Sequence, residues 1–276
     1  MATALVQVET WPVGTAAAGI VRPAGVVATT GPVDESLPWA SVTKVLTALA
    51  TLVAVEEGTV GLEDQAGPPG ASVRHLLAHA SGLPFDGTVP AVAPGTRRIY
   101  SNTGFEVLAA VVADRAGMPF GDYLAGAVLE PLGMVRTALA GSPAAGASGP
   151  LIDLIALGRE LLAPTLIAGE TLAEATGVAF PDLAGILPGF GWQDPNDWGL
   201  GFEIRDHKRP HWTGSANSPA TFGHFGRSGS FLWVDPEVRL ACVSLADRDF
   251  GPWAATAWPR LSDAVLAEFG PGLPVG

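Results

Sequence analysis

The sequence is poor in cysteine and in positive charge. Cys242 is the single cysteine among 276 residues, so no disulfide can form within the chain. Lysine and arginine number 15 against 27 aspartate and glutamate residues, which gives a formal net charge of -12. Nucleic-acid binders need clustered basic side chains, and anionic membrane surfaces attract basic segments. We therefore expect neither nucleic acid nor a membrane as a partner.

Long hydrophobic runs are also missing. The longest apolar-rich run, residues 45–55, is interrupted by Thr47 and Thr51 and falls well short of the ~20 residues that span a bilayer. No basic residue precedes Arg22, so the N-terminal segment lacks the basic region of a secretory signal. From these two observations we expect a cytoplasmic location. Cys242 itself lies in the apolar run RLACVSLA and is expected in the core.

Lysine is scarcer than the total of basic residues implies. Lys44 and Lys208 are the only two lysines, against thirteen arginines. Lys44 lies at the start of the most apolar segment of the chain. An arginine keeps its proton inside proteins, whereas a desolvated lysine can lose it and act as a base. Lys44 is therefore a candidate catalytic group.

The pattern of apolar residues predicts strands at both ends of the chain and helices in the middle. Strands are expected over residues 15–21, 24–30, 199–205, 221–234 and 238–247, and helices over 41–58, 73–80, 102–116, 122–132, 151–162 and 253–269. We expect an α+β fold with an antiparallel sheet built from residues 1–60 and 199–276 and flanked by terminal helices. Residues 61–198 are expected to form an inserted all-helical subdomain.

Ser41 and Lys44 form an S-x-x-K motif at the start of a predicted helix. Helical residues three apart share a face, and helical side chains lean toward the N-terminus, so Lys44 points back at Ser41. Burial and the positive end of the helix dipole both disfavour a charged amine there. The spacing predicts a neutral amine that takes the proton of the serine hydroxyl. The alternative is a surface lysine at a helix start.

Two further short motifs follow. Tyr100 and Asn102 form a Y-x-N motif just before a predicted helix, where the phenol can face a cleft. The alternative is that Asn102 caps the helix and Tyr100 packs in the core. His224 and Gly226 form an H-x-G motif in a predicted strand, where glycine often marks the close approach of a ligand. The alternative is a histidine beside a bulge.

The three motifs together, in the order S-x-x-K, Y-x-N and H-x-G, resemble those of the serine β-lactamases, penicillin-binding DD-peptidases and related esterases, closest to class C. The segment RHLLAHASGLP, residues 74–84, is similar to the H-L-L-x-H-x-S-G-L-P segment of that family. The segment TFGHFGRSGSFLWVDPE, residues 221–237, looks like its third-motif strand and turn. The resemblance covers about residues 15–247 and implies a β-lactamase/transpeptidase-like fold.

The resemblance also implies roles for the residues of the first two motifs. Ser41 would be acylated, and Lys44 would be its partner base. Tyr100 would be a second acid/base group that relays a proton to the leaving group. Asn102 would hold Lys44 or a substrate amide.

The third motif carries further implied roles and a departure from the family. Gly226 would let the substrate lie along the strand, and the backbone N–H groups of Ser41 and Arg227 would form the oxyanion hole. His224 replaces the lysine of K-T-G, and Phe225 replaces its threonine. A histidine is mostly neutral at pH 7, which weakens the case for substrates that carry a carboxylate, such as penicillins.

Other sites are less well supported. His75 and His79 have the i, i+4 spacing of zinc ligands, but no third ligand is evident, so a structural role beside a turn is expected. Trp198 and Trp212 could line the cleft, although tryptophan in an apolar chain is more often in the core. Neither a metal nor another cofactor is implied.

We therefore expect a serine hydrolase that cleaves a small-molecule ester or amide through an acyl-enzyme at Ser41, with esterase-like chemistry. One alternative is DD-peptidase or β-lactamase activity on D-Ala-D-Ala or penicillin-like substrates. A second alternative is a catalytically inactive binding module. The sequence leaves the oligomeric state open.

Overall fold

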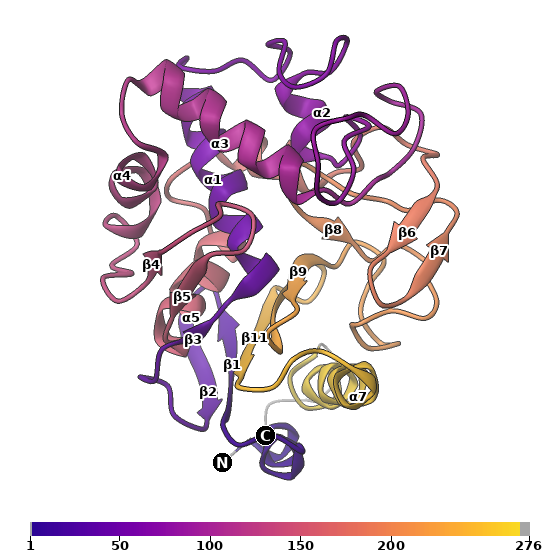
Figure 1. Cartoon of the computed structure of the whole chain (residues 1–276). Coiled ribbons are helices and arrows are strands. Elements are labelled where there is room, and N and C mark those ends of the chain that lie inside the picture. Colours follow the sequence, from indigo (N-terminus) through magenta and orange to yellow (C-terminus); the bar gives the residue numbers. More distant parts are fainter. Residues whose placement is uncertain (1, 271–276) are drawn as a thin grey trace.

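The structure, a computed structural model, describes residues 2–270. At its centre is an antiparallel sheet of six strands in the order β2-β1-β11-β10-β9-β8. Ala16 lies opposite Ala246 in the β1–β11 pair, so segments from both ends of the chain share one sheet (Figure 1). This confirms the expected α+β class. The strands are β1 (Ala16–Arg22), β2 (Gly25–Thr30), β8 (Glu203–Ile204), β9 (Phe222–Gly226), β10 (Ser230–Asp235) and β11 (Leu240–Ala246).

The sheet is buried on both faces, and every residue of its strands β10 and β11 is buried. Successive side chains of a strand point to opposite faces. In β10, Phe231 and Trp233 therefore enter one hydrophobic cluster, while Leu232 and Val234 enter the other. Cys242 of β11 is fully buried in the first of these clusters, as expected for a core residue.

Helices cover both faces of this sheet. On one face α5 (Leu151–Leu162) packs against β1, β10 and β11. On the other face the 3-10 helix η1 (Thr3–Thr10) contacts β1, β2 and the C-terminal helix α7 (Pro252–Phe269). The C-terminal helix is expected over residues 253–269, whereas the sequence predicts no helix at residues 3–10. Helix α7 is tied to the sheet by a hydrogen bond of 3.0 Å from Trp233 Nε1 to Ser262 Oγ.

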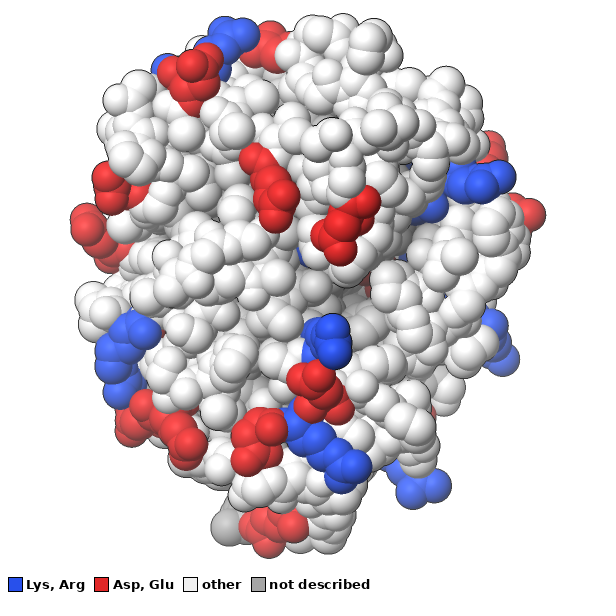
Figure 2. Space-filling model, viewed as in Figure 1, with Lys and Arg blue, Asp and Glu red and all other residues white. Residues whose placement is uncertain are grey.

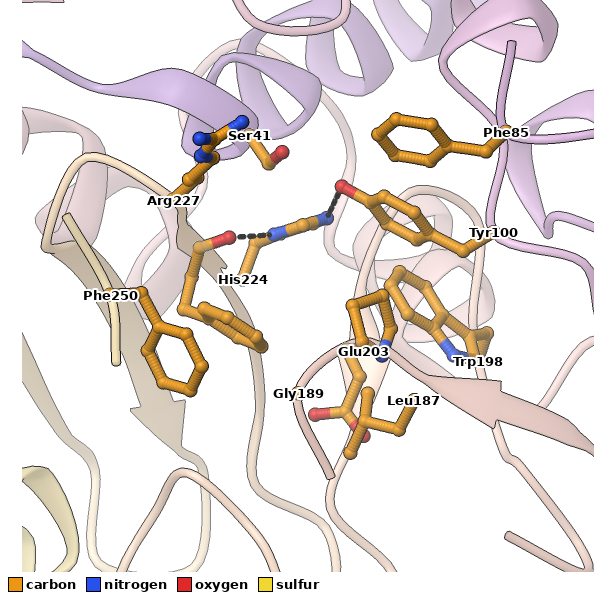
Figure 3. A pocket seen from close by; sticks show the side chains of 12 residues that line it. Ser41, Phe85, Tyr100, Leu187, Gly189, Trp198, Glu203, His224, Arg227 and Phe250 are labelled. Atoms are coloured by element: carbon orange, nitrogen blue, oxygen red, sulfur yellow. Dashed lines mark hydrogen bonds between the residues drawn. The ribbon is translucent and has the colours of Figure 1, made fainter. Parts of the chain in front are cut away.

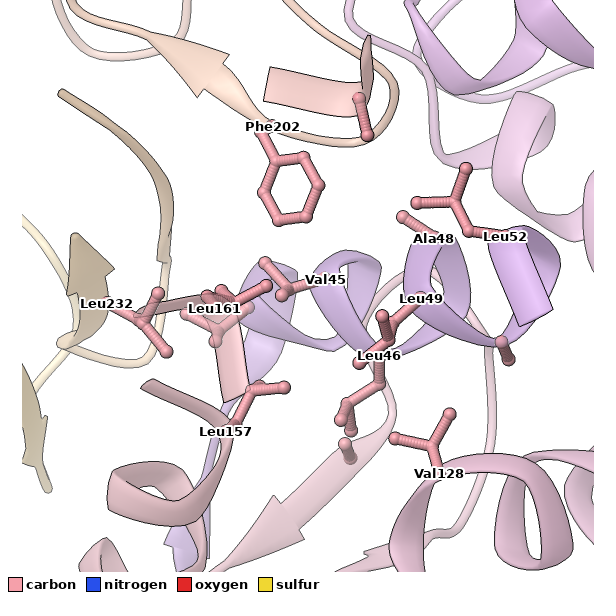
Figure 4. Close-up of a cluster of buried hydrophobic side chains, with 14 of the residues drawn as sticks. Val45, Leu46, Ala48, Leu49, Leu52, Val128, Leu157, Leu161, Phe202 and Leu232 are labelled. Atoms are coloured by element: carbon pink, nitrogen blue, oxygen red, sulfur yellow. The ribbon is translucent and has the colours of Figure 1, made fainter. Parts of the chain in front are cut away.

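Helix α1 (Thr43–Glu56) runs through the interior of the molecule. Its residues are apolar on more than one face, and nearly all of them are buried. Figure 4 shows Val45, Leu46, Leu49 and Leu52 contacting partners from several elements. Because α1 is enclosed in this way, its N-terminal end is held at a fixed place beside β9.

The segment between the two parts of the sheet is richer in strands than expected. It holds α2 (Val73–Leu77), α3 (Asn102–Ala116), α4 (Phe120–Leu124), a π-helical turn η3 (Ala125–Leu129) and α6 (Gly169–Thr176). It also holds β4 (Ala138–Leu139) and β5 (Ala147–Gly149), which pair with β3 (Leu37–Pro38), and the hairpin of β6 (Gly185–Leu187) and β7 (Gly191–Gln193). The expectation of an all-helical insertion is wrong here, because strands of two or three residues are too short to show an alternating pattern.

Two strand boundaries also differ from the sequence expectation. Residues 221–234 form two strands, β9 and β10, joined by a tight turn in which Gly229 has a φ of +89°. The turn residues Gly-Arg-Ser-Gly lie between two apolar runs, and the sequence therefore predicts one continuous strand over both runs. In residues 199–205 only Glu203–Ile204 is a strand.

The face of the molecule in Figure 2 is mostly uncharged and is hollowed near its centre, with acidic and basic side chains scattered around it. None of the described helices is both long and apolar enough to cross a membrane.

Candidate active site

A cavity of about 210 Å³ opens between the start of α1, the end of β9 and the loop after β6. Most of its wall is apolar, and the polar groups that face it are few. Figure 3 shows how these side chains converge. The lining residues are Ser41, Phe85, Tyr100, Leu187, Pro188, Gly189, Trp198, Glu203, His224, Phe225, Arg227 and Phe250. The structure thus brings four of the predicted site residues, Ser41, Tyr100, His224 and Arg227, to one cavity.

Ser41 lies in the 3-10 turn η2 (Ala40–Val42), which leads directly into α1. Ala40, the residue before it, has a φ of +44°, a left-handed conformation that is strained for a residue with a side chain. The Gly226 end of β9 lies against this turn. A Cβ atom at Gly226 would lie 2.3 Å from the Trp39 carbonyl oxygen. Only glycine therefore lets β9 come this close to Ser41.

Lys44 lies one helical turn beyond Ser41 and is fully buried. Its Nζ donates hydrogen bonds of 2.7 Å to Asn102 Oδ1 and 2.9 Å to the Ala144 carbonyl oxygen. Desolvation lowers the pKa of the Lys44 amine to about 7, although Glu106 and Asp86 favour its charged form. A substantial fraction of Lys44 is therefore neutral at pH 7. Asn102, predicted to hold Lys44 or a substrate amide, contacts Lys44.

Tyr100 stands between Lys44 and His224. The Lys44 ammonium nitrogen is 4.7 Å from the centroid of the Tyr100 ring. Burial raises the pKa of the Tyr100 phenol well above its ordinary value, despite a hydrogen bond with the Ser41 side chain that lowers it. The phenol therefore keeps its proton near neutral pH, and Lys44 is the group in this trio that can accept one.

The hydrogen bonds of His224 fix its tautomer. Its Nδ1 lies 2.7 Å from the Phe225 carbonyl oxygen, which can only accept, so Nδ1 carries the proton. Nε2 then accepts a long hydrogen bond of 3.4 Å from the Tyr100 hydroxyl. Burial and the nearby Lys44 lower the pKa of His224 to about 3, so the ring is neutral at pH 7. The Tyr100 proton is directed toward His224, and its oxygen lone pairs remain for Ser41.

His75 and His79, which have the spacing of zinc ligands, make hydrogen bonds with neighbouring parts of the chain. His79 Nδ1 accepts a hydrogen bond of 3.1 Å from the Ser101 N–H, and its ring centroid lies 4.6 Å from that of Tyr100. His75 Nδ1 lies 3.0 Å from Ser72 Oγ at the start of α2. Within residues 2–270 no group of three or more side chains is arranged to hold a metal ion.

The cap of α3 differs from the alternative considered for Asn102. Ser101 Oγ accepts a hydrogen bond of 2.9 Å from the Gly104 N–H and so caps the helix. The side chain of Asn102 is thereby left for Lys44. The Y-x-N motif thus combines a ring that faces the cavity, a helix cap and an amide beneath the cavity.

Arg227 follows β9 directly and lines the cavity. Its side chain is 86% exposed and pairs with Asp249 at 3.3 Å. The predicted role of Arg227 concerns its backbone N–H, and the exposed guanidinium is not required for that role.

Several cavity residues could not be found by sequence reasoning. Phe85 and Phe250 come from loops and Leu187 from the end of the short strand β6, and none of the three segments carries a recognisable motif. Trp198 lines the cavity as considered, whereas Trp212 is buried behind it and contacts the aromatic cluster around Phe231.

Glu203 is a polar residue of the cavity that the sequence did not reveal. It is almost fully buried and accepts hydrogen bonds from His211 Nε2 at 2.9 Å and Trp212 Nε1 at 3.0 Å, and it also pairs with Lys208. Burial alone would raise the pKa of the Glu203 carboxyl, but His211 and Lys208 hold it below its ordinary value. Two sequence signals could have indicated this cluster: the single acidic residue in the apolar run GLGFEIR, and Lys208, the second of only two lysines.

Comparison with known proteins identifies relatives with the same fold. The chain is similar to a crystal structure described as a beta-lactamase from Mycobacterium bovis, with 55% identity, a TM-score of 0.96, and coverage of 97% of this chain and 100% of that one. It is also similar in fold to EstCE1, described as a hydrolase with promiscuous acyltransferase activity, at 17% identity and a TM-score of 0.79 over 95% of this chain and 96% of that one.

The curated relatives match over a shorter stretch. Penicillin-binding protein 4* of Bacillus subtilis is 31% identical over 131 residues, which are 36% of this chain and only 29% of that protein. The family described as Beta-lactamase, in contrast, matches residues 11–267. The chain belongs to the beta-lactamase family.

Proposed function

We propose that this protein is a serine hydrolase that cleaves small apolar esters through an acyl-enzyme at Ser41. The observation that supports this most strongly is the buried Lys44 amine, whose pKa is about 7 and which lies one helical turn from the Ser41 hydroxyl. A base works best when its pKa is near the working pH, and a serine needs such a base to become a nucleophile.

In the proposed reaction Ser41 Oγ attacks the carbonyl carbon of the ester, and neutral Lys44 takes the hydroxyl proton. The carbonyl oxygen becomes an oxyanion that accepts hydrogen bonds from the N–H groups of Ser41 and Arg227. When the tetrahedral intermediate collapses, the bond to the leaving oxygen breaks. Tyr100 gives its proton to that oxygen and regains one from the Lys44 ammonium.

The second half of the reaction runs along the same path in reverse. A water molecule attacks the acyl-enzyme and loses a proton toward Tyr100 and Lys44. The bond from Ser41 Oγ to the acyl carbon then breaks, and Oγ recovers a proton. The products are a carboxylic acid and an alcohol, and the site returns to its starting state.

The preference for esters rests on the polarity of the cavity. Its wall is formed largely by aromatic and aliphatic side chains, among them Phe85, Trp198 and Phe250. His224, in the place of the family's lysine, is neutral because of its low pKa. Among the described residues that line this cavity, the cation is Arg227, which is exposed and paired with Asp249. An uncharged apolar acyl group suits this cavity better than a substrate with a carboxylate beside the reacting carbonyl.

β-Lactamase activity is the second candidate, and the 55% identity to the Mycobacterium bovis protein over nearly the whole chain favours it. Steady-state kcat/KM values for p-nitrophenyl butyrate and a chromogenic cephalosporin, measured side by side, rank the two. We expect the ester to be the better substrate. A larger kcat/KM for the cephalosporin would favour β-lactamase activity over esterase activity.

The covalent step is tested by labelling with a fluorophosphonate and measuring the intact mass. We expect the wild type to gain the mass of a single label and Ser41→Ala to gain none. Ser215→Ala, which removes an exposed serine outside the cavity, is the matched control and should label like the wild type. Absence of both labelling and ester turnover in the wild type would instead identify an inactive binding module.

A further inference from the structure

A second hollow of about 420 Å³ adjoins the catalytic cavity. It has an unusually apolar rim: Phe85, Ile186 and Trp192 are 52%, 61% and 56% exposed. Large apolar side chains gathered around one hollow mark a binding surface, because singly exposed ones are ordinary but a cluster is not. The complete lining is Phe85, Arg97, Arg98, Ile99, Tyr100, Ile186, Pro188 and Trp192.

The two hollows share a wall. Phe85, Tyr100 and Pro188 line both of them, and the rings of Phe85 and Tyr100 are stacked with centroids 6.0 Å apart. In the proposed reaction Tyr100 protonates the leaving oxygen, so the leaving group lies against Tyr100. The second hollow begins at that residue and therefore lies on the leaving-group side of the scissile bond.

The second hollow is held in shape by the chain around it. Ile186 and Trp192 are directly paired across the β6–β7 hairpin, which places both side chains on the same face. Arg98 lies beneath them, fully buried, and its guanidinium donates to the carbonyl oxygens of Ala78, Ala179, Phe180 and Asn196. The buried arginine thus ties together segments that flank the β6–β7 hairpin.

Arg97 adds a positive charge at this rim. Its guanidinium lies 5.8 Å from the centroid of the Trp192 ring, a cation–π arrangement. Among the described ion pairs of residues 2–270 none includes Arg97. In a chain with a net charge of -12, an exposed arginine that pairs with the adjoining aromatic ring instead of a carboxylate is suited to an anionic ligand group.

We propose that the natural substrate is an amphiphilic ester whose alcohol half is elongated, apolar and ends in an anionic group. The alcohol half would extend past Phe85 and Tyr100 onto the Ile186–Trp192 pair, and its charged end would meet Arg97. The acyl half would occupy the catalytic cavity. This inference rests on the proposed function and names the substrate class of the same site.

Three butyrate esters test the inference: ethyl butyrate, octyl butyrate and the butyrate ester of 8-hydroxyoctanoate. Their kcat/KM values report acylation, the step in which the alcohol leaves. In the wild type we expect a preference of about tenfold for octyl over ethyl, from partial burial of the added methylenes. We expect a further gain of several-fold for the carboxylate-ended ester.

Two variants separate the parts of the proposal. Trp192→Ala should lower kcat/KM for octyl butyrate far more than for ethyl butyrate and so remove the preference for octyl over ethyl. Arg97→Gln should remove only the gain from the carboxylate. Val135→Ala, which truncates a remote side chain that is 82% exposed, is the control and should retain both preferences.

A preference for chain length that survives in Trp192→Ala, or a carboxylate gain that survives in Arg97→Gln, would overturn this inference. Absence of either preference in the wild type would also overturn it. Ethyl butyrate turnover that depends on Ser41 would show that the proposed function stands even so. Failure of the wild type to cleave any ester would instead contradict the proposed function.

Discussion

At the scale of single residues, Lys44 has opposite consequences for activity and for stability. The amine is useful as a base because burial has lowered its pKa to about 7. The same burial makes the protonated amine costly in the folded state. Hydrogen bonds to Asn102 Oδ1 and the Ala144 carbonyl oxygen offset part of that cost. A group that serves catalysis is thus expected to reduce the free energy of unfolding.

The pH dependence of this stability cost follows from the pKa of Lys44 in the folded protein, about 7, and its ordinary value of 10.5, which applies to the unfolded chain. Below pH 7 the amine is protonated in both states, so the folded protein bears the whole penalty. Between pH 7 and the ordinary value of 10.5 the unfolded chain holds a proton that the folded protein has released, so stability rises with pH. Above 10.5 both states are neutral and the penalty is gone.

Lys44→Met should therefore be more stable than the wild type at pH 6 by a few kcal/mol, with an advantage that shrinks toward pH 10. Urea unfolding at both pH values measures the free energy of unfolding of each protein. An advantage that stays constant or grows between pH 6 and pH 10 would show that burial does not shift this pKa. The variant should be inactive at either pH.

At the scale of elements, the close contact between β9 and the turn η2 determines the geometry of the site. Gly226 permits that contact, since a Cβ atom there would lie 2.3 Å from both the Trp39 carbonyl oxygen and Ser230 Oγ. The sequence identifies the H-x-G motif, but not the strained turn at Ala40 against which its glycine packs. That contact joins residues far apart in the sequence, and no local pattern encodes it.

Gly226→Ala should push β9 away from Ser41 and lower kcat/KM for ester hydrolysis at least about 100-fold, since small misplacements of reacting groups are costly. Crowding should also destabilise the fold by about 1–3 kcal/mol. Gly121→Ala is the matched control, because a Cβ atom there meets nothing within 4 Å and the residue lies within α4. Steady-state kinetics and thermal unfolding of both variants make the comparison. Wild-type activity in Gly226→Ala would refute the packing argument.

At the scale of the whole molecule, segments from both ends of the chain complete one sheet, and the sequence predicts this well. The apolar runs near residues 15–30 and 221–247 are long enough for their strand character to show, and the α3 and α5 ranges match their predicted bounds of 102–116 and 151–162. The motif residues Ser41, Tyr100 and His224 meet in the cavity, but their catalytic roles remain predictions.

What the sequence could not supply depends on tertiary contacts. The short strands β4–β7 depend on their neighbours for their positions, and the walls of the two hollows combine loop residues with residues of the strands β6–β9. Phe85 lies in a loop and Trp192 in a strand of three residues, so neither belongs to a run long enough to show a periodic pattern. The buried cluster around Glu203 is likewise closed by a loop, through Lys208 and His211.

The contribution of η1 to the hydrophobic core between the sheet and α7 can be tested by mutations remote from the active site. Leu5 of η1 is 1% exposed in the hydrophobic cluster that contains α7 residues, so Leu5→Ala should lower the free energy of unfolding by about 2–4 kcal/mol. Val6→Ala, at a neighbouring position that is 43% exposed, should change it little. Denaturant unfolding distinguishes the two variants, and kcat/KM should be unchanged in both. Equal stability of the two variants would show that η1 does not close the core.

The pH dependence of the acylation rate tests most directly whether Lys44 is the base. In stopped-flow bursts with p-nitrophenyl butyrate from pH 5 to 9, the rate should rise with a midpoint near pH 7, where the amine loses its proton. His224→Gln should leave the midpoint unchanged, because His224 with a pKa of about 3 is neutral throughout. Lys44→Arg should lower the rate about 1000-fold and abolish the rise. A midpoint that disappears in His224→Gln, or that persists in Lys44→Arg, would contradict the account.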